Sequence, residues 1–234
     1  MMSNPKKTPA IENQWRGIGK TGAFAAFAML AIMMAQIAIF ILWPLPATVE
    51  GFFQLFRENK WLGLLSMDLL YILNNTLLIL FYLGIFTVLK QINFSAALIA
   101  LVLGVVGVAA YYSSNTAFEM LSLSNLHAAS ADEAQRAVYL AAGQSMLEVY
   151  KGTAFDTYYI LNGISLIIFA ALCYQSRVFS RTTAIIGLLA GILMSIPSTA
   201  GKVGLVFSLL SLIPWAVFSI LVAVRLLRIY AREG

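Results

Sequence analysis

Six long stretches of the chain contain no charged residue, and each is long enough to cross a membrane as a single helix. The hydrocarbon core of a bilayer is about 30 Å thick, so a spanning helix needs roughly 20 apolar residues. The pattern predicts an all-α polytopic membrane protein with one transmembrane domain at 21–230, a basic leader at 1–20 and a short tail at 231–234. The expected spans are about 21–43, 62–89, 94–118, 154–175, 182–201 and 203–226.

The connection after the first span has an amphipathic pattern. Between Thr48 and Trp61, apolar residues recur at helical spacing, with charged residues on the other faces. This pattern predicts a short helix that lies in the membrane interface and anchors the chain there. The alternative is a lid over an outer pocket. The apolar positions are Val49, Phe52, Phe53 and Phe56.

A second helix is expected between the third and fourth spans, at 130–150. Ser130 and Glu133 have the spacing of a capping box, in which each side chain accepts a hydrogen bond from the backbone of the first turn. Small residues along one face of this segment indicate close packing on the bundle. A connector exposed to solvent is the alternative.

Charge placement predicts the orientation. Hydrophobic residues make up 61% of the chain and charged residues 11%. With the amino terminus inside, ten of the fifteen lysines and arginines fall on the cytoplasmic side, as the positive-inside rule requires. We therefore expect a multi-pass protein of the cytoplasmic membrane with both termini inside. The basic residues are scattered over loops and tails, which argues against a nucleic-acid site.

Glycines and prolines in the last two spans suggest packing surfaces and hinges. Gly187 and Gly191 form a small-xxx-small pair, which permits close helix packing within the chain or in a homo-oligomer. Pro197 and Pro214 are expected to interrupt the fifth and sixth spans, where proline frees a backbone carbonyl and kinks the helix. Both are candidate hinges.

Polar residues in the second, third and fourth spans are the best candidates for a functional site. Asp68 is expected roughly 10 Å below Trp61 along its helix, and ionisable groups at such depth usually face a protein interior or a wet cavity. Since the relevant ends of these three spans share the outer half of the membrane, we expect a pocket open to the outside. The candidate ligand-binding residues are Asp68, Tyr71, Asn74, Asn75, Tyr112, Asn115, Glu119, Asp156, Tyr159 and Asn162.

Carboxylates and tyrosines can bind a cation or an organic amine by charge, hydrogen bonding and cation–π contact. Burial could also raise the pKa of Asp68 enough for coupling to protons. In the alternative interpretation, Glu119 and Asp156 are ordinary helix-end residues, and the asparagines and tyrosines tie helices together. The chain has one histidine and one cysteine, so we expect no metal site and no cofactor.

The layout of the chain resembles a family of bacterial six-span integral membrane proteins of unknown function. The features that carry the resemblance are the basic leader, the aromatic first outer connection, the capped outer helix, and the basic tail after Pro214 and Trp215. The similarity covers roughly Gly19–Ile229. It implies a bacterial or archaeal inner-membrane setting and assigns no catalytic residue.

Three functions remain open from the sequence. The first is a non-enzymatic protein that binds or transports a small cationic or polar solute through the outer pocket. The second is a structural or regulatory partner in the membrane, with helix 130–150 and the Gly187/Gly191 face as its surfaces. The third is an intramembrane enzyme, which we favour least because no nucleophile and base can be paired.

Overall fold

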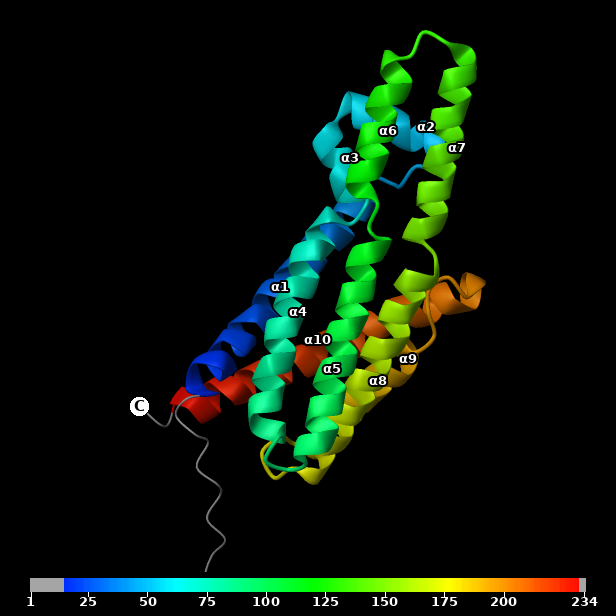
Figure 1. The fold of residues 1–234 in the computed structure, drawn as a ribbon. Coiled ribbons are helices and arrows are strands. Elements are labelled where there is room, and N and C mark those ends of the chain that lie inside the picture. The colour runs from blue at the N-terminus through cyan, green and yellow to red at the C-terminus, as the bar shows by residue number, and fades with distance from the viewer. Residues whose placement is uncertain (1–14, 232–234) are drawn as a thin grey trace, which may run out of the picture.

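The computed structural model describes residues 15–231, and that part of the chain is helical, without strands (Figure 1). Residues 1–14 of the expected leader lie outside the described residues. So does the expected tail, except for Ala231. Residues 16–20 of the leader belong to the first helix. The helices are α1 (Arg16–Leu42), α2 (Val49–Glu58), α3 (Lys60–Ser66), α4 (Leu69–Leu89), α5 (Phe94–Ser114), α6 (Ala117–Ala129), α7 (Glu133–Tyr150), α8 (Thr153–Gln175), α9 (Arg181–Met194) and α10 (Gly201–Ala231).

The predicted class, an all-α polytopic membrane protein, is confirmed. Five helical segments of the described chain are long and apolar enough to span a membrane, and they contain α1, α4, α5, α8 and α10. The helix in the expected fifth span, α9, has only 14 residues and ends at Met194. At about 1.5 Å per residue it covers roughly 21 Å.

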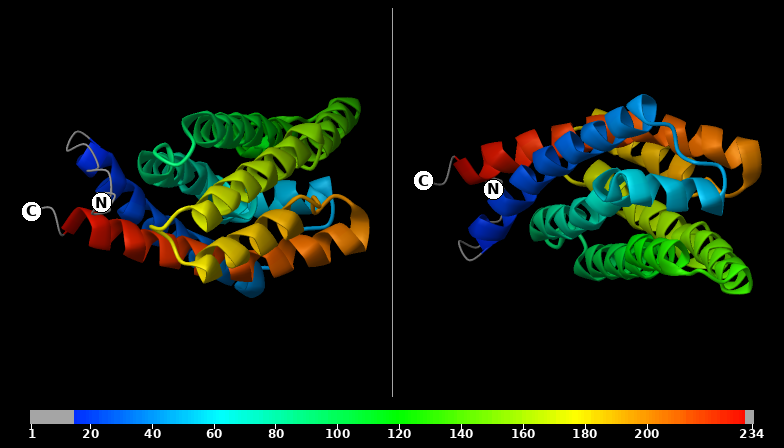
Figure 2. Two further views of the ribbon diagram at one scale, coloured as in Figure 1. Left: turned by 90° about the horizontal axis from the view of Figure 1, so that it is seen from below. Right: turned by 90° about the horizontal axis from the view of Figure 1, so that it is seen from above.

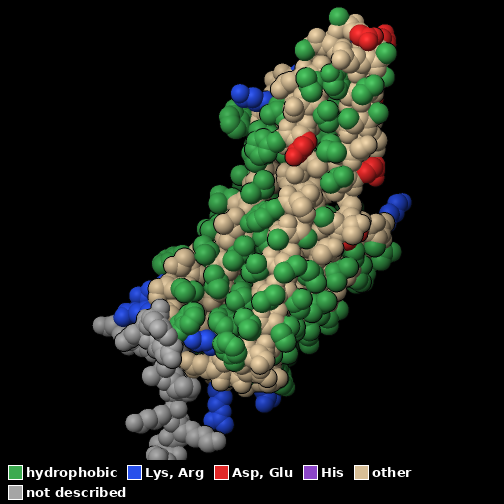
Figure 3. All heavy atoms as spheres, in the orientation of Figure 1, with side chains coloured by type: hydrophobic (Ala, Val, Ile, Leu, Met, Phe, Trp, Pro, Cys, Tyr) green, Lys and Arg blue, Asp and Glu red, His purple; other side chains and the backbone are tan. Residues whose placement is uncertain are grey.

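The first described residues and the last lie at the same end of the bundle (Figure 1). We call the opposite end the distal end. Basic side chains are prominent near the chain ends, and acidic side chains are seen towards the distal end (Figure 3). This distribution agrees with the expected charge asymmetry, while the cytoplasmic location of the termini remains a prediction.

Three helix breaks lie between the lower bundle and the helices of the distal end (Figure 1). Asp68 separates α3 from α4, the pair Asn115 and Thr116 separates α5 from α6, and Lys151 ends α7. The Asn115 side-chain amide donates to the Met67 carbonyl at 2.9 Å, and the Thr116 hydroxyl donates to the carbonyl of Met146 at 3.1 Å. These bonds join the three breaks.

Two of the breaks fall within expected spans. Because α4 and α5 have 21 residues each, each covers about 31 Å and crosses the hydrocarbon core without further residues. The expected spans 62–89 and 94–118 each contain one of these breaks, and their bounds in a membrane remain a prediction. Asp68 lies immediately before α4 rather than within it, and α6 is a helix that the sequence pattern did not indicate.

Beyond the breaks, α2, α3, α6 and α7 form a distal lobe with its own core. The helix expected after the first span is present as α2, and its phenylalanines pack on this core, while its place in the membrane interface remains a prediction. The core residues are Val49, Phe52, Phe53, Phe56, Leu64, Met67, Ala117, Met120 and Leu147.

The helix expected at 130–150 is present as α7, but its cap differs. Asp132, not Ser130, accepts the hydrogen bond from the backbone of Ala134. The Ser130 hydroxyl instead donates to Gln135. Most of α7 is exposed, and its buried residues are Gly143 and Leu147, so the expected small-residue face does not pack along its whole length.

Glycines allow close approaches inside the bundle. A Cβ on Gly187 would lie 2.6 Å from the Phe218 ring of α10, and a Cβ on Gly191 would lie 2.8 Å from Ile167 of α8. Both glycines are buried, so this surface is covered within the chain and is not free for a partner. Pro214 lies inside α10 as expected, whereas Pro197 lies in the connection after α9 and interrupts no helix.

Removing the link between the distal breaks should weaken the lobe. We expect Asn115→Ala to lower the free energy of unfolding by about 1–3 kcal/mol, because it removes the bond to Met67 and the 3.2 Å bond accepted from the Ala117 amide. The exposed Asn125→Ala is the matched control. Thermal unfolding of the purified variants checks this, and equal stabilities would contradict the assigned role of the link.

Candidate functional site

A cavity of about 710 Å³ lies in the distal half of the bundle, within the usual range of about 300–1,000 Å³ for small-molecule sites. Its walls come mainly from α1, α4, α8 and α10, with contributions from α5, α9 and the connections around residues 151 and 198–202. Lining residues include Met33, Ile37, Phe40, Leu45, Asp68, Tyr71, Asn74, Leu78, Tyr82, Tyr111, Tyr150, Lys151, Phe155, Tyr158, Tyr159, Ala190, Met194, Ser198, Thr199, Lys202, Leu205, Ser208, Leu209, Ser211, Leu212 and Trp215.

The carboxylate of Asp68 is positioned in the cavity wall by the start of α4 and the end of α7. Asp68 precedes α4 with φ of 60°, a left-handed conformation that aspartate and asparagine tolerate better than most residues. Its side chain is 8% exposed, and one carboxylate oxygen accepts a hydrogen bond from the Tyr150 hydroxyl at the end of α7. Residues 82 positions apart in the chain thus meet at one wall of the cavity.

At this wall, one carboxylate oxygen and one amide oxygen are buried without a donor among the residues that the structure describes. They are Oδ1 of Asp68 and Oδ1 of Asn74, whose side chains are 8% and 9% exposed. Leaving a buried polar group unpaired costs about 1–3 kcal/mol, more for a charged one. The arrangement therefore favours a ligand that brings hydrogen-bond donors to Asp68.

Asp68 lies one residue before the membrane-crossing helix α4. Burial raises the pKa of its carboxyl to about 6, and the hydrogen bond from Tyr150 opposes this shift. The ionised form is thus disfavoured until a cationic or donating partner compensates for the lost hydration.

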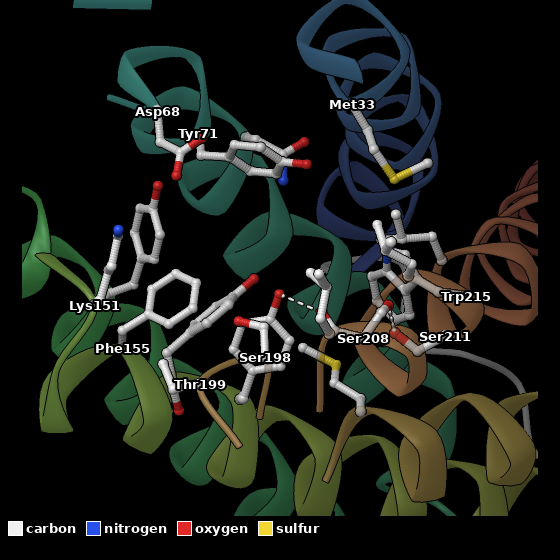
Figure 4. Close-up of a pocket in the computed structure, with 18 of the residues that line it drawn as sticks. Met33, Asp68, Tyr71, Lys151, Phe155, Ser198, Thr199, Ser208, Ser211 and Trp215 are labelled. Atoms are coloured by element: carbon white, nitrogen blue, oxygen red, sulfur yellow. Dashed lines mark hydrogen bonds between the residues drawn. The ribbon is translucent and has the colours of Figure 1, made fainter. Parts of the chain in front are cut away.

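The remainder of the cavity is mostly apolar and elongated. From Asp68 to Tyr82, α4 rises about 21 Å, and from Lys202 to Trp215, α10 rises about 20 Å. Figure 4 shows Asp68 and Lys151 at one side and Trp215 at the other, with Ser208 and Ser211 nearer Trp215. The Ser208 hydroxyl donates to Tyr159 at 2.9 Å, and the Ser211 hydroxyl donates to the Ser208 carbonyl at 2.6 Å. These hydroxyls are therefore already paired within the protein.

Two lysines also line the cavity. Lys151 and Lys202 are both exposed. Exposed charges are screened by water and salt much more than buried ones. The carboxylate of Asp68 is the buried charge, so it should dominate the selection of a ligand group placed beside it.

Four of the ten expected site residues line the cavity: Asp68, Tyr71, Asn74 and Tyr159. Asn75 and Asn162 are fully buried and connect helices, since Asn75 accepts from Tyr158 at 3.0 Å and Asn162 accepts from Tyr82 at 2.9 Å. Both therefore have the role that the alternative interpretation gave them.

The other four expected residues do not line the cavity. The Tyr112 hydroxyl pairs with Thr76 at an exposed position, and Asn115 joins the distal breaks. Glu119 is exposed on α6. Asp156 accepts a hydrogen bond from Thr199, so it positions a lining residue without being one. Of the three carboxylates that the sequence suggested as one site, Asp68 is the one that lines the cavity.

Sequence reasoning missed most of the cavity wall. Tyr150 and Lys151 belong to the end of the connecting helix, and the apolar wall comes from α1 and α10, which carried no polar signal. Tyr112 was the expected tyrosine of α5, whereas its neighbour Tyr111 is the one that lines the cavity.

One family matches almost the whole chain. The match covers residues 21–229, and the family is described as a domain of unknown function, DUF4386. The chain belongs to this family. No curated protein and no solved structure matches the chain. The expected membership in a family of unknown function is confirmed, while its bacterial setting remains a prediction.

Proposed function

We propose that this DUF4386 protein binds a small organic cation with N–H donors, such as a protonated amine, beside Asp68. The observation that carries the proposal is the unpaired, buried Asp68 carboxylate oxygen in the wall of a ligand-sized cavity. A primary ammonium group offers charge and three donors, so it can complete the pairing of Asp68 and Asn74.

The cavity supports binding rather than catalysis. No lysine or histidine pairs with a serine at its wall, and the assigned hydroxyl bonds among the described lining residues are those of ordinary helix packing. We therefore propose a binding or transport protein of the cytoplasmic membrane, with the distal end outside and both termini inside. The basic residues near the termini support this orientation.

Thermal unfolding of the purified protein tests the proposal. We expect butylamine to raise the unfolding temperature, since a ligand that binds the folded state stabilises it by mass action. Tetramethylammonium carries the same charge without N–H donors and should stabilise less. Acetate serves as the anionic control. No response to the amine, or equal responses to all three compounds, would refute the proposal.

The same measurement has an expected pH dependence. Because the pKa of Asp68 is raised to about 6, ionising its carboxyl lowers the stability of the unliganded protein as the pH rises from about 4 to about 6. Binding of the amine requires the ionised carboxylate, so stabilisation by butylamine should grow between pH 5 and pH 7. The titratable groups that interact with Asp68 are Tyr71, Tyr111, Tyr150, Tyr158 and Tyr159, and Lys151 and Lys202 line the same cavity. Tyrosine ordinarily titrates near pH 10, so Asp68 is the carboxyl expected to change charge in this range.

A further inference from the structure

Part of the cavity lining is apolar and reaches the surface of the protein, in addition to the polar wall. Three of its lining leucines are strongly exposed: Leu45 by 45%, Leu205 by 51% and Leu209 by 57%. They lie just after α1 and on the distal half of α10. In a membrane protein, apolar side chains exposed at this depth face hydrocarbon rather than water.

The packing of α1 and α10 explains why this lining reaches the surface. Their ends meet near the termini, where a Cβ on Gly19 would lie 2.0 Å from the Tyr230 ring. Further along, α1 is tied to α3 by the bond from Gln36 to the Leu65 carbonyl, whereas α10 is tied to α8 by the bond from Ser208 to Tyr159. The two helices therefore diverge towards the distal end. Figure 1 shows this divergence, and Figure 2 shows both helices on one side of the bundle, with α5 on the other.

The cavity has a polar part at Asp68 and an apolar part along α10, an arrangement that suits an amphiphilic ligand. Asp68 lies immediately before α4, whereas Trp215 lies about 20 Å beyond Lys202 along α10, and all three residues line the cavity. A polar group at the interface and an apolar chain in the hydrocarbon region is the arrangement that lipids and single-chain amphiphiles adopt in a bilayer.

We propose that the ligand of this cavity is a long-chain primary amine, whose ammonium group pairs with Asp68 and whose alkyl chain lies along α10 towards Trp215. This assignment rests on the proposed function, because it uses the same carboxylate. It adds the tail, which a polar solute such as butylamine lacks, and it makes the bilayer the source of the ligand through the opening between α1 and α10.

Fluorescence of Trp215 tests where the tail lies. A variant with Trp15, Trp43 and Trp61 replaced by phenylalanine keeps Trp215 as its tryptophan, and it is placed in lipid nanodiscs. The probe is dodecylamine brominated at its terminal carbon, because bromine quenches a tryptophan that it contacts. We expect saturable quenching, shifted to at least tenfold higher probe concentration by Asp68→Asn and unchanged by the exposed Glu119→Gln. Dodecanoate brominated in the same way should quench weakly, without dependence on Asp68.

The assignment would be overturned if Asp68→Asn left the quenching unchanged. It would also be overturned if brominated dodecylamine and brominated dodecanoate quenched Trp215 equally. Stabilisation by butylamine that depends on Asp68, without quenching of Trp215, would refute the long-chain ligand and leave the proposed function intact. Failure of both measurements would refute both. If the three tryptophan replacements prevent folding, the native chain gives a second readout. Dodecylamine should then stabilise it at lower concentration than butylamine, and equal potency would contradict a bound tail.

Discussion

Replacing Asp68 with asparagine is expected to weaken amine binding by roughly 10- to 100-fold while leaving the protein folded. Hydrogen bonds to charged groups contribute about 1.5–3 kcal/mol, and about 1.4 kcal/mol corresponds to tenfold in affinity. Asparagine tolerates the left-handed backbone at this position, where φ is 60°. The substitution removes a buried charge, so the unfolding temperature of the unliganded variant at pH 7 should equal or exceed that of the native protein.

A second substitution separates the carboxylate from its protein donor. The hydroxyl of Tyr150 donates to Asp68 and thereby lowers the pKa of that carboxyl. Tyr150→Phe should therefore move the pH of half-maximal amine binding above about 6. Tyr112→Phe is the control, because its hydroxyl also forms a bond, to Thr76, but outside the cavity. Titrations of binding against pH in the two variants check this, and identical midpoints would contradict the role of Tyr150.

The second large effect is expected at the crossing of α1 and α4. A Cβ on Gly22 would lie 2.7 Å from Gly84 Cα and 2.7 Å from the Leu80 carbonyl oxygen, so backbone lies against backbone. Even Gly22→Ala should cost about 1–3 kcal/mol, the usual range for overpacking, and Gly22→Leu should cost more. No atom lies within 4 Å of a Cβ on Gly17, so Gly17→Leu in the same helix is the matched control.

Thermal unfolding and expression in the membrane measure the effect of the Gly22 substitutions. The expected result is a clear loss of folded Gly22→Leu protein alongside a stable Gly17→Leu variant. Comparable stability of the two variants would show that α1 and α4 can separate without cost. Because α1 also lines the cavity, weaker amine binding in a surviving Gly22→Ala protein would follow from the same displacement.

Long runs without charge were sufficient to predict the fold class, because a bilayer leaves few alternatives for such segments. Helix faces were much harder to predict. In α4 and α5 apolar residues surround the whole helix, so the pattern does not show which side faces protein. The regular spacing of Tyr112 and Asn115 suggested one face, but Tyr111 is the tyrosine of α5 that lines the cavity.

The positions of the distal breaks also could not be predicted from local sequence signals. Neither Met67–Asp68 nor Asn115–Thr116 contains glycine or proline, the usual signals for ending a helix. Their positions depend on tertiary bonds such as Asn115 to Met67, which local sequence does not encode. The same holds for Tyr150, which reaches Asp68 only because α7 folds back along α6.

The shortness of α9 has a consequence for the membrane around this protein. Its roughly 21 Å is about 9 Å less than the hydrocarbon thickness, a hydrophobic mismatch on one flank of the bundle. Bilayers adjust to a short segment by local thinning. The polar connection at 195–200 ends this helix and contributes Ser198 and Thr199 to the cavity wall. Lipid headgroups that dip towards this connection would come within reach of the cavity from the side as well as from above.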